Sequence, residues 1–326
     1  MGLAEKIKDA ENGITDNEFL LFDRITKIKS VIEKYGEDNF YISFSGGKDS
    51  TVLHYLVDMA LPNNRIPRVY ANTGIELNMI KDFVYEMQKN DDRIVIIKPS
   101  VPIKPTLEKF GYPFKSKKHA KLVGMYHRLG KTQSVQTYLG EKTTRYKKTL
   151  EDKSFQCPDK LRFQFDENYN LKISDKCCEK IKEQPLINWA KENKKQYRII
   201  GVMASEGGRR MKAKCMAFRN GKFKNFQPLV AVTKEWEDWF IYNYDVKICC
   251  IYKEPYNFVR TGCKGCPFAI DLQNELDTLE RYFPNERKQC EIIWEPVYSE
   301  YRRLHYRLKP EPMYKQISID ELLKDQ

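Results

Sequence analysis

The chain has 326 residues and contains no run of about 18 consecutive apolar residues, the length that a membrane-spanning helix needs. Its amino-terminal stretch alternates charged residues with short apolar pairs and lacks the apolar region of a signal peptide. Disordered and collagen-like classes are excluded too, since 41% of residues are hydrophobic and 31% are charged. We therefore expect a cytoplasmic globular protein without membrane contact, long enough for one large core or two moderate ones.

Acidic residues are in deficit. The 57 Lys and Arg residues exceed the 45 Asp and Glu residues, and the net charge of +12 favours an anionic partner. The deficit is concentrated in the segment Lys115–Lys148, which holds ten basic residues and a single acid, Glu141. This basic segment predicts a surface for nucleic acid or polyphosphate, and a solvated, mobile insert is the alternative. Four aromatic residues that could stack on unpaired bases lie among or beside these charges: Tyr112, Phe114, Tyr126 and Tyr146.

Short β-rich runs alternate with helical patterns along much of the chain. We expect strands at 40–44, 68–71, 93–97, 197–201 and 246–250, and helices at 16–34, 51–60, 176–193 and 233–242, with another ending near Met87. Such alternation implies right-handed crossovers and a parallel sheet covered on both faces. Residues 101–173 predict an insertion with two short helices, and two amphipathic helices are expected at 271–282 and 285–306.

Residues 45–50, with the sequence Ser-Gly-Gly-Lys-Asp-Ser, follow the first expected strand and lead into a helix. Backbone N–H groups and the helix dipole can hold an anion there, the glycines allow close approach of phosphate oxygens, and Lys48 adds a charge. The spacing is not that of a Walker A loop. The sequence therefore predicts a phosphate site, with a turn that binds nothing as the alternative. Its residues are Ser45, Gly46, Gly47, Lys48, Asp49 and Ser50.

This segment resembles the PP-loop of the adenine nucleotide α-hydrolase superfamily, which cleaves ATP between its α and β phosphates. Two further segments resemble the phosphoadenosine phosphosulfate (PAPS) reductase branch. Residues 72–76 are similar to its D-T-G-x-E element, and residues 201–210 to its G-x-R-x-x-E-S-x-x-R stretch, with Met203 at the first arginine. The resemblance implies that Asn72, Thr73 and Gly74 line the adenosine, that Gly201 approaches the ribose, and that Arg209 or Arg210 clamps an anionic group. A turn without a role and an exposed basic pair are the alternatives for these two segments.

Nine cysteines in a chain expected to be cytoplasmic favour buried, metal-bound or catalytic thiols over disulfides. Cys177-Cys178 and Cys263-x-x-Cys266 offer four soft ligands, and the spacing alone suits zinc or an iron–sulfur cluster. Residues 177–186 resemble the C-C-x-x-x-K-x-x-P-L segment of adenylyl-sulfate reductases. That resemblance implies a [4Fe–4S] cluster on Cys177, Cys178, Cys263 and Cys266, with Lys182 between cluster and substrate. Buried cysteines without a metal are the alternative, and Cys249-Cys250 is assigned to core packing.

Sulfonucleotide reductases carry a catalytic cysteine near the carboxyl terminus, but no cysteine follows Cys290 in this chain. The intact loop at 45–50 is instead expected of enzymes that bind ATP with Mg²⁺ and release pyrophosphate. The resemblance thus implies an ATP pyrophosphatase that adenylates an acceptor for sulfur transfer, acting through Lys48, Asp49, Lys182, Arg209 and Arg210. A sulfonucleotide reductase with another nucleophile and a non-catalytic regulator are the alternatives.

The expected architecture is α/β: a Rossmann-like parallel sheet sandwiched by helices, of the adenine nucleotide α-hydrolase type. We divide the chain into a helical segment at 1–36, the PP-loop domain at 37–268 with its basic insertion at about 101–173, and a helical region at 269–326. The expected partners are an adenine nucleotide, a nucleic acid on the basic segment Lys115–Lys148, and a sulfur donor protein. The cations of that segment could instead meet only the triphosphate of ATP.

Overall fold

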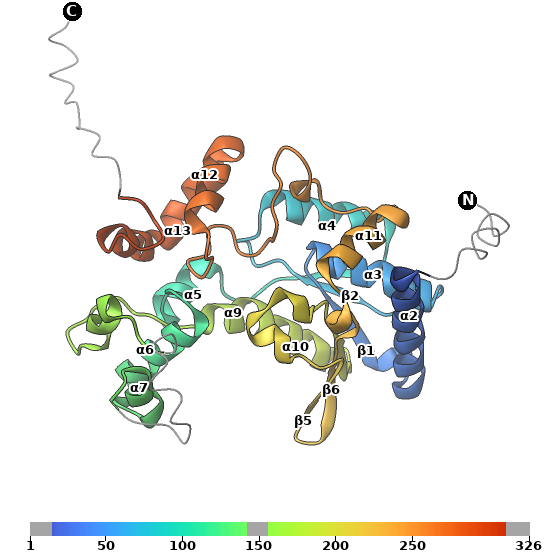
Figure 1. The fold of residues 1–326 in the computed structure, drawn as a ribbon, viewed down its shortest axis with the longest axis horizontal. Helices are drawn as coiled ribbons and strands as arrows, with labels where there is room; N and C mark the ends of the chain where they lie inside the picture. Colours follow the sequence, from blue (N-terminus) through green and yellow to red (C-terminus); the bar gives the residue numbers. More distant parts are fainter. Residues whose placement is uncertain (1–14, 142–155, 311–326) are drawn as a thin grey trace, which may run out of the picture. The chain divides into compact units, whose positions relative to one another are not determined.

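The computed structural model describes residues 15–141 and 156–310, which belong to two compact units (Figure 1). Unit 1 is formed within residues 1–102 and 178–263, and unit 2 within residues 103–177 and 264–326. Among the described residues, no helix combines the length and the apolar character that crossing a membrane requires.

Unit 1 is built on a six-stranded sheet with the strand order β3-β2-β1-β4-β6-β5. The strands are β1 (Phe40–Phe44), β2 (Arg68–Ala71), β3 (Ile94–Ile97), β4 (Tyr197–Ile199), β5 (Met216–Arg219) and β6 (Lys222–Phe226). The sheet is parallel except that β5 runs antiparallel to β6. Together with the helices between the strands, this arrangement confirms the expected Rossmann-like α/β fold.

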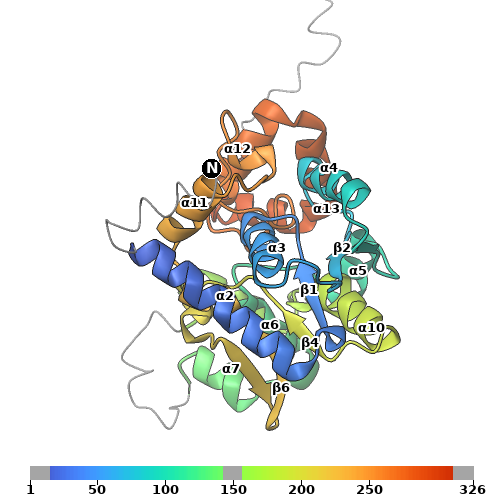
Figure 2. The same cartoon turned by 90° about the vertical axis from the view of Figure 1, so that its right-hand side faces the viewer.

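Side chains of β1 alternate between two covered faces of the sheet, as a strand dictates. The helices of unit 1 are α2 (Asp16–Tyr35), α3 (Lys48–Ala60), α4 (Asn78–Asn90), α10 (Gln184–Glu192) and α11 (Lys234–Asn243). Phe40 and Ile42 pack in a core with α2, α3 and α11, and Phe44 packs with α4. Tyr41 points to the other face, where α10 supplies Leu186 and other apolar side chains. Figure 2 shows α2 and α3 on one side of the strands and α10 on the other.

Helix boundaries follow local sequence signals. Helix α2 begins with a capping box in which Thr15 and Glu18 satisfy each other's backbone, and it ends at Gly36 with φ of 81°. Helix α11 is capped by the Thr233 side chain. Helix α3 begins at Lys48, earlier than expected, and its N-cap Gly47 makes no side-chain capping bond. The first turn of α3 therefore keeps backbone donors for another partner.

The helix expected at 176–193 is interrupted by a π-helical segment. Helix α9 (Lys176–Cys178) passes into a π-helix at Glu179–Glu183, which continues as α10. Pro185 has no N–H to donate, and its ring would press on the carbonyl of Ile181 in a regular α-helix. The wider π turn accommodates both features.

Two expectations about strands are corrected by the structure. The β5–β6 hairpin was not expected, although Asn220-Gly221 between short β-rich runs is a strong hairpin signal. The strand expected at 246–250 is wrong, because Val246 N–H donates to the Ile241 carbonyl at the end of α11 and Cys250 begins a 3₁₀ turn. Within the described residues, this segment pairs with neither edge strand of the sheet, β3 or β5.

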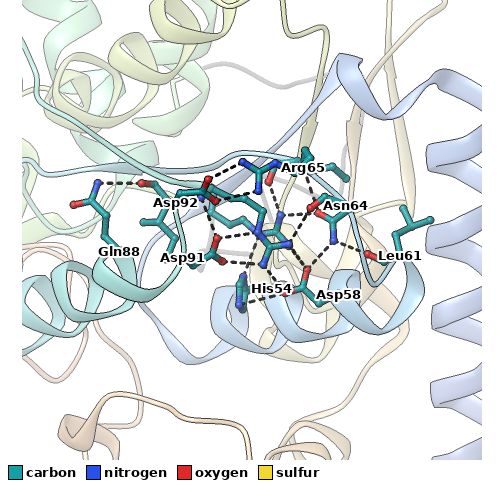
Figure 3. Close-up of polar contacts among 12 residues, drawn as sticks. His54, Asp58, Leu61, Asn64, Arg65, Gln88, Asp91 and Asp92 are labelled. Carbon is teal, nitrogen blue, oxygen red and sulfur yellow. Dashed lines mark hydrogen bonds and ion pairs between the residues drawn. The ribbon is translucent and has the colours of Figure 1, made fainter.

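A buried polar network lies at the amino ends of β2 and β3 (Figure 3). Arg68 is fully buried, and its guanidinium donates to His54 Nδ1 at 3.1 Å, to Asn64 Oδ1 at 2.7 Å and to Asp58 Oδ1 at 2.6 Å. Arg93 donates to both oxygens of Asp58, at 2.8 and 2.9 Å. Burial, followed by the Arg68 charge, lowers the pKa of His54 to about 4, so the imidazole is neutral.

Unit 2 is helical and includes the whole described part of the basic segment, residues 115–141. Its helices are α5 (Ile103–Phe110), α6 (Lys117–Leu129), α7 (Gln133–Tyr138), α12 (Leu272–Tyr282) and α13 (Pro284–Arg303). The described part of the insertion before residue 142 thus contains three α-helices, where two were expected for the whole insertion. The two helices after Cys266 are confirmed.

Aromatic side chains form much of the core of unit 2. Phe114 is fully buried, with its ring 4.6 Å from that of Tyr301. The Tyr301 hydroxyl accepts a bond from Lys115 N–H at 2.7 Å and donates to the Pro267 carbonyl at 2.8 Å. Because Tyr112 is buried as well, the expectation that Tyr112 and Phe114 stack on bases is wrong. Residues 142–148 of the basic segment, including Tyr146, lie outside the described residues.

Candidate functional site

A cavity of about 210 Å³ opens in unit 1 where β1 and β4 end. The strand order reverses at this point, since β2 lies on one side of β1 and β4 on the other, and α/β sheets bind ligands at such switch points. Three separate segments line the cavity. They contribute Ser45, Gly47, Lys48, Asp49 and Ser50; Gly201, Glu206 and Arg210; and Tyr252, Arg260 and Thr261.

The loop at 45–50 is held in a fixed shape by its own side chains. Ser45 Oγ lies 2.9 Å from Ser50 Oγ, and Ser50 Oγ also donates to the Gly47 carbonyl at 2.9 Å. Gly46 has a φ of 70°, and a Cβ there would come within 2.5 Å of Val84 Cγ2. Only glycine fits this position without moving helix α4. The loop is thus a preformed turn that presents the uncapped start of α3 to the cavity.

Lys48 and Asp49 lie at the cavity beside a buried carboxylate of α11. Lys48 Nζ is 2.9 Å from Asp238 Oδ1 and 3.5 Å from Oε2 of Glu237, which is fully buried. Lys234 Nζ lies 2.8 Å from the same Glu237 oxygen. Burial, followed by the neighbouring Glu237 carboxylate, raises the pKa of Asp49 to about 6. Because the negative charges of Asp49 and Glu237 repel each other, an added cation or proton stabilises the pair.

Two arginines converge on one carboxylate at the far side of the cavity. Arg210 and Arg260 both pair with Glu206 Oε1, with Arg260 at 2.7 Å. The other oxygen of Glu206 is buried and has no hydrogen-bond partner among the described residues. The structure therefore brings Arg210 to the cavity, as the sequence predicted, whereas the side chain of Arg209 is not among the described features.

Gly201 serves the contact between β4 and helix α3. A Cβ at this position would lie 2.9 Å from the Asp49 carbonyl oxygen and 3.3 Å from Ser50 N. Glycine is required because the backbone after β4 crosses directly over the first turn of α3. Met203, which occupies the place of an arginine in the similar segment, is buried in the core around α2 and α3.

A second cavity, of about 190 Å³, shares Ser43, Ser45 and Thr261 with the first. Its other polar lining comes from β2, from the π segment and from β4: Tyr70, Glu76, Lys182, Glu183 and Arg198. Arg198 donates to Glu183 Oε2 at 2.6 Å and to Ser43 Oγ at 2.9 Å, while its Nε is buried without an acceptor. The Tyr70 hydroxyl is likewise buried and unpaired.

The segment at 72–76 meets the second cavity through its last residue. Glu76 is nearly buried and receives bonds from Thr73 N–H at 3.1 Å and from Thr73 Oγ1 at 2.6 Å. Asn72 accepts from Gly74 N–H at 3.1 Å and donates to the Tyr85 hydroxyl at 3.1 Å. Asn72, Thr73 and Gly74 line neither cavity, so in this structure they shape the turn that orients Glu76.

The four cysteines expected to bind a cluster are divided between the units. Cys178 and Cys263 belong to unit 1, and Cys177 and Cys266 to unit 2. In unit 1, Lys182 is hydrogen-bonded to Cys263, and its interaction with Cys263, followed by those with Glu76 and Cys178, raises its pKa. Across the described ranges, no three His, Cys, Asp or Glu side chains are gathered to hold a metal ion. The cluster ligands therefore stay a prediction.

In unit 2, helices α12 and α13 hold the backbone of the Cys-x-x-Cys loop. Trp294 Nε1 donates to the Lys264 carbonyl at 3.0 Å, and Gly265 N–H donates to Glu275 Oε1 at 2.9 Å. Lys264 is buried, with its Nζ 3.1 Å from Glu286 Oε2. The backbone of this loop and the Lys264 side chain are thus tied to α12 and α13.

The remaining cysteines of the second half differ in exposure. Cys249 is buried in unit 1 and its thiol donates to the Met79 carbonyl at 3.4 Å, whereas Cys250 is exposed. Core packing thus applies to Cys249 alone. Cys290 is fully buried in α13 of unit 2, and burial raises the pKa of its thiol to about 12.

Sequence reasoning missed several residues that line the two cavities. Tyr252, whose hydroxyl pairs with Thr261 Oγ1, carried no motif. Arg260 and Thr261 precede the first cysteine of the Cys-x-x-Cys motif, which was their only signal. Arg198 lies inside a strand, where an alternating pattern with one charged residue could have marked it.

The phosphoadenosine phosphosulfate reductase domain model matches the chain over residues 39–149 and 142–269, which together are more than half of its length. No curated protein sequence matches the chain significantly. Among solved structures, a phosphoadenylyl-sulfate (PAPS) reductase from Candida auris in complex with phosphate matches with 11% identity and a TM-score of 0.38, covering 73% of this chain and 91% of that one. The U34-tRNA thiolase NcsA from Methanococcus maripaludis with its [4Fe–4S] cluster matches with 16% identity and a TM-score of 0.32, covering 91% of this chain and 82% of that one.

Proposed function

The chain belongs to the phosphoadenosine phosphosulfate reductase domain family, and from that membership we propose that it is an ATP pyrophosphatase that adenylates an acceptor for sulfur transfer. The observation that carries the proposal is the first cavity. There the uncapped start of α3, Lys48, Arg210 and Arg260 surround one space in unit 1. Backbone donors at a helix start together with three cations suit a chain of phosphates.

Each of these groups has a distinct task in the proposed reaction. The amides at the start of α3 bind phosphate oxygens, and Lys48 neutralises the pyrophosphate that departs from the α phosphate. Arg210 and Arg260, which Glu206 holds in position, bind an anionic group. Asp49, whose pKa is raised, would help to hold the Mg²⁺ that accompanies a triphosphate, and that cation would stabilise its charged form. Catalysis is then mainly positioning and charge neutralisation.

The buried state of Cys290 favours this reaction over sulfonucleotide reduction. A reductase nucleophile must be an accessible thiolate, and Cys290 is a buried thiol of raised pKa in the core of unit 2. It is also the last cysteine of the chain. Cys290 therefore does not supply the nucleophile that a reductase needs.

We also propose the [4Fe–4S] cluster on Cys177, Cys178, Cys263 and Cys266. The donor set suits the group, since four thiols are its usual ligands. Lys182, hydrogen-bonded to Cys263 and lining the second cavity, would hold an anionic sulfur species or acceptor there. A bound cluster would supply iron to which that sulfur can attach.

We also propose that the acceptor is a nucleic acid and that it binds the basic segment Lys115–Lys148. Among its described residues, Lys117, Lys121 and Arg128 of α6 are exposed. Their charge supports binding of a polyanion. Neutralising Lys117 and Lys121 should then weaken RNA or DNA binding.

The proposed function is tested by pyrophosphate release from ATP, with anaerobically purified protein and a mixture of candidate acceptors. We expect release by the parent protein and a loss of at least about 100-fold for Lys48→Ala, because one charge stabilising the leaving group is removed. Lys234→Ala, which removes a lysine from the same carboxylates without touching the cavity, is the matched control. Sulfite release from adenylyl sulfate or its 3′-phosphate, without pyrophosphate release from ATP, would contradict the proposal.

A further inference from the structure

The β5–β6 hairpin of unit 1 is a projecting ribbon with its own turn and bulge. Both views show it extending from the sheet (Figures 1 and 2). Asn220 and Gly221 have φ values of 51° and 72°, which is the geometry of a tight two-residue hairpin turn. Phe218 pairs with Phe223 and Ala217 with Asn225, so Lys224 is the extra residue of a β-bulge. The hairpin is therefore a defined element and not a loose loop.

The hairpin and the segment leading to it carry charge of one sign. Between Arg209 and Lys224 seven residues are basic and none is acidic. Five of them are exposed and make no ion pair among the described residues: Lys212, Lys214, Arg219, Lys222 and Lys224. Since only Arg210 of the described side chains here has a carboxylate partner, the ribbon presents uncompensated positive charge.

An aromatic ring is exposed among these charges. Phe218 is 57% exposed, and its ring centre lies 5.7 Å from that of Phe223. Phe223 is buried against Tyr35 at 4.6 Å and Tyr197 at 4.8 Å. Phe218 is thus the outer end of an anchored row of rings, with one face available for a planar group.

We propose that the β5–β6 hairpin binds a single-stranded segment of nucleic acid, with phosphates on Arg219, Lys222 and Lys224 and a base stacked on Phe218. Cations that alternate with an exposed ring suit unpaired bases, whose faces a duplex would hide. Protection of a sheet edge by lysine does not explain the pattern. β6 pairs with β4 only at Asn225 and Phe226, so the ribbon at Lys222 and Lys224 is open on that side, but an exposed phenylalanine such as Phe218 does the opposite of protecting an edge.

The same stretch of chain connects the hairpin with the first cavity. Arg210 lines the cavity, and Lys212 and Lys214 follow it on the way to β5. A strand bound along these cations has a charged path toward the phosphate site. The inference that the acceptor is a nucleic acid rests on the proposed function, whereas the inference that the hairpin binds nucleic acid does not.

Fluorescence anisotropy with labelled 20-nucleotide oligouridine and oligodeoxythymidine tests the binding without ATP. Arg219→Gln, Lys222→Gln and Lys224→Gln combined should weaken binding at least about 10-fold and reduce the salt slope by about 2, at roughly 0.7 per phosphate contact. Phe218→Ala should weaken it about 5- to 100-fold, as expected for one stacked base. The control combines Lys191→Gln, Lys247→Gln and Lys253→Gln, which remove the same charge from exposed positions of unit 1 outside the hairpin.

The two oligonucleotides show whether RNA or DNA is preferred, and thermal melting shows that each variant is folded. Binding that falls equally in the control, or falls only when Lys117 and Lys121 are neutralised, would overturn the hairpin assignment. Lys222→Gln and Phe218→Leu, as single surface changes, keep the test open if the combined variant unfolds. Pyrophosphate release is measured separately, so its absence alongside specific binding would contradict the proposed function and leave the hairpin assignment standing.

Discussion

At the amino ends of β2 and β3, each guanidinium nitrogen of Arg68 and Arg93 has a hydrogen-bond acceptor, and the carboxylates between them are fully used. Toward the carboxyl ends of β2 and β4, Tyr70 and Arg198 each keep a buried polar atom without a partner. Arg68 and Tyr70 are two residues apart on one strand and share a face. The two side chains come from the same strand and are both buried, so they differ only in whether the protein supplies hydrogen-bond partners for them.

The difference teaches where a ligand is expected. A buried polar atom without a partner costs about 1–3 kcal/mol, a cost that the network around Arg68 avoids completely. Five side-chain atoms are buried without a partner among the described residues; those of Tyr70, Arg198 and Glu206 belong to residues that line the two cavities, whereas those of Glu237 and Arg287 do not. The three cavity-lining residues are therefore arranged for groups that the protein chain does not supply.

Removing Arg68 from the saturated network should have the largest effect on stability. Arg68→Met takes the donor from His54 Nδ1 and one of the buried cations from Asp58, which keeps Arg93, and we expect a loss of about 3–5 kcal/mol in the free energy of unfolding. Urea unfolding followed by circular dichroism measures it. ATP affinity, measured under conditions where the variant is folded, should be unchanged. A loss below about 1 kcal/mol would show that the network is not a unit.

The two regions should respond to pH with opposite signs. The pKa of His54 is lowered to about 4, so the unfolded chain takes up a proton first and stability falls as pH drops from about 6.5 to 4, by up to about 3 kcal/mol. The pKa of Asp49 is raised to about 6, so stability falls as pH rises from about 4 to 6, by about 2 kcal/mol. Across pH 4–7, the unfolding free energy of His54→Gln should lack the fall toward low pH, and that of Asp49→Asn should lack the fall toward high pH. Parallel curves for both variants and the parent would contradict the assignment.

Removing an unpaired hydroxyl should have the smallest effect. Tyr70→Phe takes away a buried group that has no partner, so we expect a change in unfolding free energy of less than about 1 kcal/mol, in the stabilising direction. If a ligand uses the hydroxyl, the KM for acceptor or nucleotide should rise while stability does not fall. A clear loss of stability would mean that the hydroxyl has a partner in the free protein.

Much of unit 1 could be predicted because its signals are local. Alternation along 40–44, the glycines at 46 and 47 and the Thr233 cap each depend on a few neighbouring residues. The strand expected at 246–250 is wrong for a non-local reason, since a strand needs a partner strand and Val246 bonds instead to the end of α11. The role of Arg260 at the cavity could not be predicted either, because only the fold brings it to Glu206, 54 positions earlier in the chain.

Two predictions made from the sequence, for Gly201 and Phe114, were incomplete or wrong. Gly201 was expected to approach a ribose, and the structure adds that it must clear the backbone of Asp49. Phe114 appeared suited to stack on bases because its neighbours are charged, but hydrophobic burial against Tyr301 prevails. Charge patterns in a sequence show where cations are, and they do not show which way an adjacent ring turns.

The π-helical segment Glu179–Glu183 separates two parts of one continuous helix that have different roles. A π turn holds more residues than an α turn, so it offsets the side chains before it from those after it by about one residue. Cys178 and Lys182 can thereby be directed toward the second cavity and its surroundings, while Leu186 of α10 keeps its place against the sheet. Deleting one residue here would remove the extra residue of the π turn, rotate one of the two sets out of position and bring the Pro185 ring against a carbonyl of the preceding turn. The length of this segment is therefore expected to tolerate change less than its composition.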